Sequence, residues 1–400
     1  MNATNPVNLA ALRRPGAEIK EALITKNMAF LSHTFNDAIS VEAFYQLGWS
    51  EVVVDNCGTF FSSSYLVAKG CNRAVITGGR DLDLSTQVFI PRVDDRDPLD
   101  SGQFGLALKW YAEEFNSTEF GAYVMSYHSR GPNLTVISVD GSAPVPGNPG
   151  LAVSSRYFVD YPEDVRLYGL SFQTNITATG TSLGGEISYR PNMPMQINGN
   201  DLVGSAMVPA AARPAPTNPL YWTGHGSLIA GGEVTGYVRK PFTQAQMTAV
   251  HISRRCWVRW ATATSTNWVA ARVGTFVLAG IRYSVVALLQ LLAHARRLRQ
   301  PNAPRMAATP VTPGGYRVRG NLEYSNVFMG VALPSSLVFS HDVKGYGPTF
   351  TEGNKAVSVG LDASYKNTYS AGISYTDFFG GDFNTASDRD FLFVNFGVNF

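Results

Sequence analysis

The sequence predicts an all-β protein, an antiparallel transmembrane β-barrel that is incomplete and has long loops. Three observations predict it. Apolar and polar residues alternate in many segments, most of these segments approach the roughly 9 to 11 residues that a tilted strand needs to cross a bilayer, and the chain has many rings but few charges. Aromatic residues make up 12% of the 400 residues and charged ones 16%, with 38 glycines and 18 tyrosines. We expect one barrel over residues 1–400, because all the strands of a barrel close a single sheet.

The alternation identifies the strands. Each alternating segment places apolar side chains on one face and polar or small side chains on the other. These segments are residues 40–49, 104–110, 166–172, 183–190, 317–324, 357–366, 369–376 and 391–400. Strands of soluble sheets average about five or six residues, so their length favours a membrane. The alternation alone does not decide between lipid and a soluble core, because both bury one face of each strand.

Ordered blocks of residues carry a resemblance to a known family. They are Asn5–Glu18, Val41–Trp49, Cys57–Ser62, Tyr127–Arg130, Tyr161–Phe172, Gly185–Asn192, Ser340–Tyr346 and Tyr375–Asp382. Through them the chain resembles the domain of unknown function 1302 family, which contains uncharacterised, porin-like outer-membrane proteins of Gram-negative bacteria. The resemblance covers residues 5–245 and 315–400. It implies an outer-membrane location, the lipid bilayer as a partner, and passive passage or binding of a small solute that it does not identify.

The chain ends in an alternating strand whose last residue is aromatic. One face of this strand holds Val394, Phe396, Val398 and Phe400. The pattern resembles the assembly signal of outer-membrane barrels and implies the outer-membrane assembly machinery as a partner. We expect residues 314–400 to form the C-terminal barrel strands.

The N-terminal residues contain no secretory signal, since they have neither a basic start nor an apolar stretch. An outer-membrane protein requires such a signal, so we expect the sequence to be truncated at this end. Residues 1–25 are predicted to form a loop and a short helical turn. Arg13 and Arg14 either line the lumen or bond to carbonyls and carboxylates within a turn.

Residues 247–313 depart from the rest of the chain. No acidic residue lies between Glu233 and Glu323, and the charged side chains of residues 251–312 are nine arginines. We interpret this segment as a misread frame. The alternative is an inserted amphipathic or membrane helix, although its apolar core of about eleven residues is shorter than the roughly 20 that span a bilayer. In both cases local propensity predicts a non-native helix near residues 283–300.

Charged residues of both signs are the candidates for a constriction in the lumen. A loop folded into a barrel can carry opposed charges that select solutes, but a solvated extracellular loop has a similar composition. The candidates in this loop are Arg92, Asp94, Asp95, Arg96, Asp97 and Asp100. Glu186 and Arg190 share the polar face of a predicted strand, which indicates a solvated interior.

Cys57 and Cys71 bracket a loop rich in Gly, Ser and Asn, and we predict a disulfide between them. A bond closing such a loop is worth about 3 kcal/mol on the entropic model and requires an oxidising compartment. Two unpaired thiols or half of a metal site are the alternatives. Cys256 lies in the arginine-rich segment, and we assign it no role. The six histidines lack ligand spacing, so we predict no metal and no cofactor.

The remaining motifs do not indicate catalysis. Gly180–Gly184 matches the G-x-S-x-G pattern of hydrolases, but a strand is predicted where a hydrolase has a helix, so a turn is the better explanation. His128 and His225 are candidate bases with no nucleophile placed beside them. A net charge of +2 without a basic stripe argues against nucleic acid as a partner.

We therefore predict a porin-like protein that is not an enzyme and whose polar lumen passes or binds a small solute. Three alternatives remain open. They are a structural or adhesive barrel that conducts nothing, an outer-membrane hydrolase, and a non-functional gene remnant.

Overall fold

The computed structural model of the protein is made mostly of antiparallel β-strands. It describes residues 5–12, 19–62, 66–75, 89–139, 144–145, 148–152, 154–199, 202–203, 206, 231–262, 265–279, 313–345, 350–366 and 368–398. Two four-residue helices, α1 (Leu9–Leu12) and α2 (Ile19–Ala22), lie near the N-terminus. Among the described residues, no helix has the length and apolar character needed to cross a membrane.

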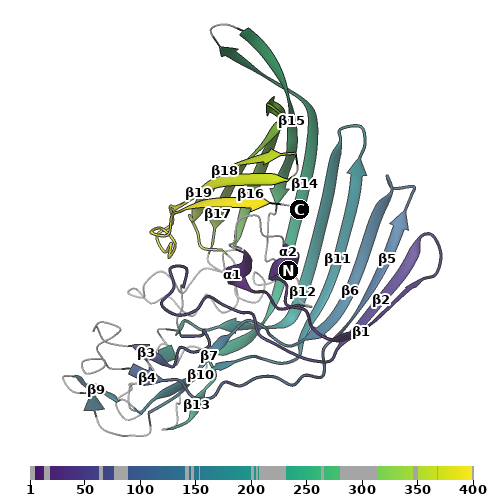
Figure 1. The fold of residues 1–400 in the computed structure, drawn as a ribbon. Helices are drawn as coiled ribbons and strands as arrows, with labels where there is room; N and C mark the ends of the chain where they lie inside the picture. The colour runs from purple at the N-terminus through teal and green to yellow at the C-terminus, as the bar shows by residue number, and fades with distance from the viewer. Residues whose placement is uncertain are drawn as a thin grey trace.

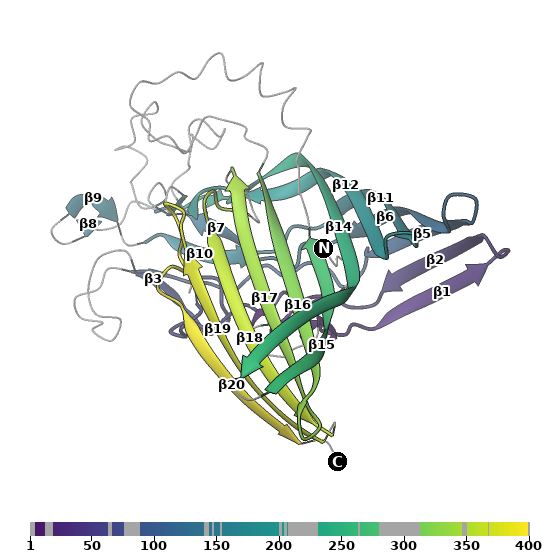
Figure 2. The same ribbon diagram turned by 90° about the horizontal axis from the view of Figure 1, so that it is seen from above.

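Thirteen strands form one large, curved antiparallel sheet (Figure 1, Figure 2). In sheet order they are β1 (Met28–Thr34), β2 (Ile39–Gln46), β5 (Phe104–Ala112), β6 (Thr118–Tyr127), β11 (Val165–Ile176), β12 (Thr181–Gln196), β14 (Tyr237–Thr262), β15 (Ser265–Ala279), β16 (Gly314–Phe328), β17 (Val331–Lys344), β18 (Lys355–Tyr365), β19 (Tyr369–Phe379) and β20 (Phe391–Val398). The sheet order follows the chain order, so each strand pairs with the large-sheet strand that precedes or follows it. This is the topology of consecutive hairpins.

The alternating segments of the sequence all fall on strands of this sheet, which confirms the prediction of antiparallel β-structure. The arginine-rich segment, up to Ala279, belongs to β14 and β15, and both strands pair with their neighbours. β14 pairs with β12 and with β15, and β15 pairs with β16. The helix predicted near residues 283–300 lies outside the described residues.

The connections between strands alternate strictly in length. At one end of the sheet, here called the turn end, the strand bounds leave connections of two to five residues, namely residues 35–38, 113–117, 177–180, 263–264, 329–330 and 366–368. At the other end, here called the loop end, the connections are residues 47–103, 128–164, 197–236, 280–313, 345–354 and 380–390. The two-residue turn between β16 and β17 has φ of 47° at Met329 and 87° at Gly330. Positive φ at both central residues is what a type I′ hairpin requires.

A smaller layer is built from the long connections at the loop end (Figure 1). Its three-stranded sheet has the order β10 (Arg156–Asp160), β7 (Asn133–Ile137) and β13 (Glu233–Val234). Two further pairs, β3 (Arg73–Val75) with β4 (Phe89–Pro91) and β8 (Pro144–Val145) with β9 (Asn148–Ala152), come from the same connections. We call this assembly the loop layer.

The loop layer contains a buried hydrophobic core. Its buried residues are Ala74, Ile90, Leu134, Val136, Tyr157, Leu202, Val203, Ala206 and Val234. Segments far apart in the sequence converge there, so this core ties three of the long connections together. The large sheet therefore meets, at its loop end, a compact unit that is stabilised in the manner of a soluble protein.

Candidate functional site

The two faces of the large sheet differ in chemistry. One face, here called the apolar face, carries large hydrophobic side chains that remain exposed. They include Leu106, Leu108, Val124, Leu170, Ile187, Leu337, Val359, Leu361, Ile373, Leu392, Val394 and Phe396. Leu170 is 60% exposed and Phe396 is 73% exposed. This face continues from one strand to the next, because apolar residues stand opposite each other in the register, as in the pairs Leu170 with Ile187 and Ile373 with Val394.

The opposite face, here called the polar face, carries hydrogen-bonded side chains. Lys109 Nζ on β5 lies 2.7 Å from Glu42 Oε1 on β2. The hydroxyls of Tyr123 and Ser171 lie 2.9 Å apart, which joins β6 to β11. On the other part of the sheet, Thr376 Oγ1 donates to Ser358 Oγ over 3.0 Å. Polar groups on this face therefore satisfy one another across strands.

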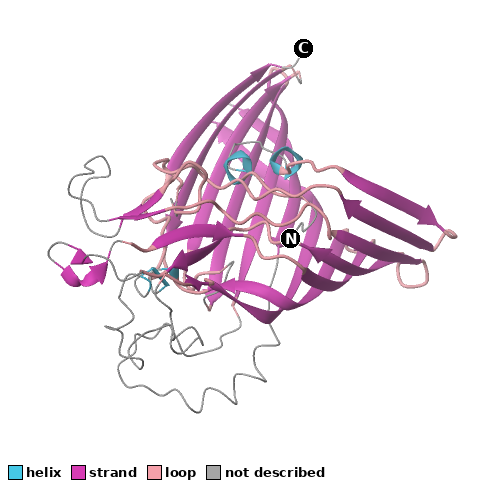
Figure 3. Ribbon diagram, turned by 90° about the horizontal axis from the view of Figure 1, so that it is seen from below, coloured by secondary structure: helices cyan, strands magenta, loops and turns pink. Residues whose placement is uncertain are grey.

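Small residues let side chains lie flat against the polar face. The Cβ that an alanine would add at Gly105 meets the ring of Phe44, and one added at Gly121 meets the Tyr123 hydroxyl. These two rings occupy the space over the glycines. Figure 3 shows loops and the two short helices lying across the hollow side of the curved sheet.

Glu186 and Arg190 lie on the polar face, as the alternation of β12 predicted. Glu186 stands opposite Ser171 of β11 in the register. Arg190 is buried, and it donates from Nε to the Tyr127 hydroxyl at 3.0 Å and from Nη1 to Ser188 Oγ at 3.3 Å. Arg190 therefore braces the polar face near its loop end.

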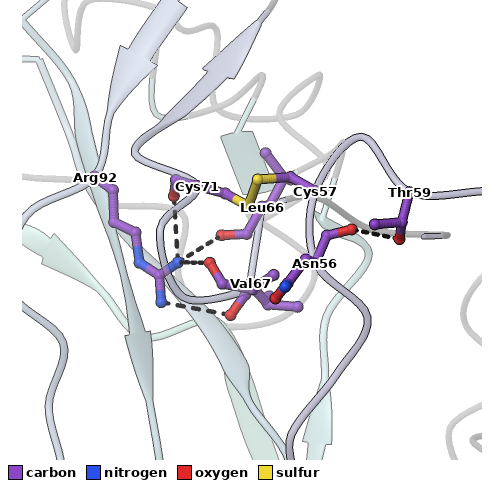
Figure 4. Close-up of a disulfide and its surroundings, with 8 residues drawn as sticks. Asn56, Cys57, Thr59, Leu66, Val67, Cys71 and Arg92 are labelled. Atoms are coloured by element: carbon purple, nitrogen blue, oxygen red, sulfur yellow. Dashed lines mark hydrogen bonds between the residues drawn. A yellow bond between two sulfur atoms is a disulfide. The ribbon is translucent and has the colours of Figure 1, made fainter. Parts of the chain in front are cut away.

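Arg92 lies beneath the loop that contains Cys57 and Cys71 (Figure 4). The Sγ atoms of the two cysteines are 2.10 Å apart, as a disulfide. The Arg92 guanidinium donates to the carbonyl oxygens of Ala68 at 2.6 Å and Cys71 at 3.3 Å. Its other side binds both carboxylate oxygens of Asp95, at 2.9 and 2.6 Å. Arg92 thus fixes the disulfide loop on the loop layer.

Arg96 joins the strands of the loop layer. It binds Glu233 of β13 through two hydrogen bonds, of 2.9 and 2.6 Å, and reaches Asp160 of β10 at 3.4 Å. Its guanidinium also lies 4.8 Å from the centre of the Phe158 ring. Burial raises the pKa of Asp160 above its usual value, and the Arg96 charge opposes that rise. The pKa of Arg96 is raised by its hydrogen bond to Glu233.

The remaining constriction candidates are dispersed. Asp100 accepts a hydrogen bond of 2.7 Å from the backbone amide of Trp49. Burial raises the pKa of Asp97. Asp94 is exposed, and Arg13 and Arg14 lie outside the described residues. The structure thus joins Arg92 to Asp95 and ties Arg96 to the loop layer, and the role of these residues in solute selection stays a prediction.

A buried polar cluster where the loop layer meets the large sheet was missed by the sequence analysis. Arg130 donates to Gln46 Oε1 at 2.6 Å, to Gln103 Oε1 at 3.3 Å and to the Ser50 carbonyl at 3.0 Å. Burial lowers the pKa of Arg130 to about 10. The sequence signal was the block Tyr127–Arg130, which contributed to the resemblance but has no periodicity that could assign a contact.

His128 and the G-x-S-x-G match have the following surroundings. His128 is buried, its Nε2 lies 2.7 Å from the Ser101 carbonyl, and its Nδ1 accepts a bond of 3.1 Å from the Asp164 amide. Ser182 lies on β12 directly after the turn that Gly180 closes with a φ of 65°. Among the described residues, no group of three or more His, Cys, Asp or Glu side chains could hold a metal ion. His225 lies outside the described residues.

The C-terminal strand presents its apolar residues outward. Val394, Phe396 and Val398 are exposed on the apolar face of β20. Phe400 lies outside the described residues. The face that resembles an assembly signal is therefore accessible along β20.

Comparison with known proteins assigns the chain to a family. No curated protein matches the chain. One family model matches, over residues 1–400, a range that includes the arginine-rich segment as well as the blocks that carry the resemblance. The protein belongs to DUF1302, a family described as "Protein of unknown function".

Proposed function

We propose that the protein is an outer-membrane β-barrel whose large sheet closes around a polar lumen through which a small solute passes or in which it binds. The observation that supports this most is the contrast between the two faces of the sheet. One face exposes large apolar side chains over strand after strand, while the other pairs polar groups. A membrane barrel needs this arrangement, because its outer wall meets hydrocarbon and its interior meets water.

Apolar exposure on this scale is costly in water. Each large aliphatic side chain left in water forgoes roughly 1.5–3 kcal/mol relative to a buried one. Leu106, Leu170, Ile187, Leu337 and Leu392 are all exposed by more than two fifths of their surface. Lipid around the apolar face removes this cost without a protein partner.

Aromatic rings on the apolar face support the same environment. Trp110 stacks on Phe120 with ring centres 5.4 Å apart, towards the turn end of β5 and β6. Tyr168 and Tyr189 are paired in the register towards the loop end. Rings at both ends of an apolar band are typical of the two membrane interfaces.

The lengths of the connections orient the barrel. Outer-membrane barrels have short turns on the periplasmic side and long loops on the extracellular side. The turn end would thus face the periplasm and the loop layer, with its disulfide, would face the outside. In this orientation β20 ends at the periplasmic side, where the assembly machinery would recognise its apolar face.

The polar face would supply the mechanism of passage. Hydroxyl groups such as those of Tyr123, Ser171 and Ser358 can exchange hydrogen bonds with a hydrated solute. The opposite charges of Glu42 and Lys109 give the wall a local field without a large net charge. This wall would bind a polar solute weakly enough to release it.

Reconstitution in planar lipid bilayers tests the proposal. We expect the purified protein to insert and to produce discrete conductance steps in KCl. Insertion without any conductance would favour a structural or adhesive barrel. Failure to insert, with a monomer that stays soluble without detergent, would overturn the proposal.

A further inference from the structure

One long connection at the loop end crosses the hollow side of the sheet. Residues 47–62, here called the strap, leave the end of β2 and reach the start of β20. There the ring of Phe61 meets that of Phe391 edge-on, with centres 5.4 Å apart, and Arg389 Nη2 donates to the Ser62 carbonyl at 3.0 Å. β2 is second in the sheet order and β20 is last. The strap therefore joins the β2 side of the sheet to its last strand, and Figure 3 shows loops crossing the hollow between the two sides of the sheet.

The base of the strap is held by backbone groups. The Val52 amide donates to the Arg130 carbonyl at 2.8 Å, and the Val53 amide donates to the Val7 carbonyl at 3.0 Å. In return the Leu9 amide donates to the Val53 carbonyl at 2.9 Å, which places the N-terminal segment alongside the strap. These bonds tie the base to segments that are themselves packed on the sheet.

Trp49 adds a side-chain anchor to the base. Its indole Nε1 donates to the Ser129 carbonyl at 3.1 Å, and its ring lies edge-on to Tyr161 with centres 4.7 Å apart. The disulfide then joins Cys57, within the strap, to Cys71 beside the loop layer. The strap is thus held from Trp49 to Cys57 by a side-chain anchor, by backbone hydrogen bonds and by a covalent bond.

The contacts at β20 are of another kind. The ring pair of Phe61 with Phe391 and the bond from Arg389 both depend on side chains that can rotate away. A segment with a fixed base and a side-chain contact at its tip has the construction of a latch.

We propose that the strap is a gate over the lumen, latched on β20 by Phe61 and Arg389. This inference rests on the proposed passage of solutes and adds its regulation. With the latch engaged, the strap and the N-terminal segment obstruct the hollow side at the loop end. When the latch releases, the part of the strap beyond Cys57, which the disulfide holds, moves away from β20, and the path between the polar walls of the sheet widens.

Single-channel recording of a latch variant tests the gate. Phe61→Ala with Arg389→Gln removes both contacts, and we expect the ratio of open to closed time to rise at least about threefold, since each contact contributes on the order of the thermal energy or more. Phe35→Ala with Arg156→Gln is the matched control, because Phe35 is an exposed ring at the turn end and Arg156 an exposed arginine of β10. The control should gate like the unaltered protein.

A cross-linked variant tests the opposite state and does not depend on how well the double variant folds. Ser62→Cys with Arg389→Cys, bridged by a short bismaleimide, should hold the channel in its closed level. Equal gating in the latch variant and the unaltered protein, or an unchanged conductance after cross-linking, would contradict the proposed gate. Neither result would contradict the proposed passage of solutes. Absence of conductance in every form, the latch variant included, would overturn both.

Discussion

Arg92 and Asp95 form a two-pronged ion pair under the disulfide loop, with nitrogen to oxygen distances of 2.9 and 2.6 Å. The Arg92 side chain is only 6% exposed. Because the same guanidinium also binds carbonyl oxygens of the loop, and because Asp95 Oδ1 accepts a 3.0 Å bond from the Val159 amide, the pair joins the loop to β10. Arg92 is therefore a buried cation that helps to hold the disulfide loop on the loop layer.

Replacing this cation should loosen the loop layer. We expect Arg92→Met to destabilise the layer by about 3–5 kcal/mol, because the substitution leaves the Asp95 carboxylate without its charge partner and the carbonyls without a donor. Hydrogen exchange of the amides of Val93 and Arg96, which bond to β10, measures the change. Arg156→Met, at an exposed arginine, is the control. Equal protection in both variants would show that Arg92 is not a structural centre.

Gly236 should be irreplaceable for steric reasons. A Cβ at this position would collide with the backbone carbonyl of Leu134 and with the Leu202 side chain. The collision is with backbone, so rotation of a side chain cannot relieve it, and we expect Gly236→Ala to cost at least about 3 kcal/mol. At Gly131 an added Cβ meets nothing within 4 Å, so Gly131→Ala should be tolerated. Hydrogen exchange across β7 and β13 distinguishes the two variants, and an unchanged β7 in Gly236→Ala would contradict the packing described here.

The loop layer should respond to pH through Asp160. Burial raises the pKa of this carboxyl in the folded state. The contribution of Asp160 to the stability of the fold is therefore full below the pKa of the carboxyl in the unfolded chain, and it is lost as the pH rises through the pKa in the folded state. Hydrogen exchange of the β10 amides, corrected for intrinsic exchange, is compared with that of an Asp160→Asn variant. Relative to this variant, the protection of β10 should be greater at pH 4 than at pH 7. Asp160→Asn cannot ionise, so the difference between the two proteins should be largest at pH 7. A constant difference across this range would refute the role of Asp160.

The strands could be predicted from the sequence wherever one face is apolar and the other polar. Leu392, Val394, Phe396 and Val398 alternate with Phe393, Asn395 and Gly397, and β20 follows the pattern. Where both faces are mixed, the pattern fails. In β6, Gly121 and Met125 stand on the polar face, and in β17 a proline at position 334 interrupts the run, so both strands were missed. β14 and β15 pair with their neighbours, but the sequence analysis did not predict them.

The contacts of the loop-layer residues were harder to predict from the sequence than the strands. The sequence identified Arg92, Asp95 and Arg96 as a charged run, but their partners Asp160 and Glu233 lie 64 and 137 positions away from Arg96. Contacts at such separations follow from the packing of several loops. The pair Cys57 and Cys71 was easier to predict, because its 14-residue separation is local.

A pair of arginine substitutions on β11 tests most directly whether the apolar face of the sheet meets lipid. Leu170 is exposed on the apolar face near the middle of β11, and Gln173 is exposed on the polar face of the same strand. Folding into lipid vesicles, followed by denaturant titration, should show that Leu170→Arg costs about 2–4 kcal/mol, the range for arginine at the bilayer midplane. Gln173→Arg should cost less than about 1 kcal/mol, because its side chain would face water in the lumen. If Leu170→Arg is as stable as Gln173→Arg, the apolar face does not lie in a membrane.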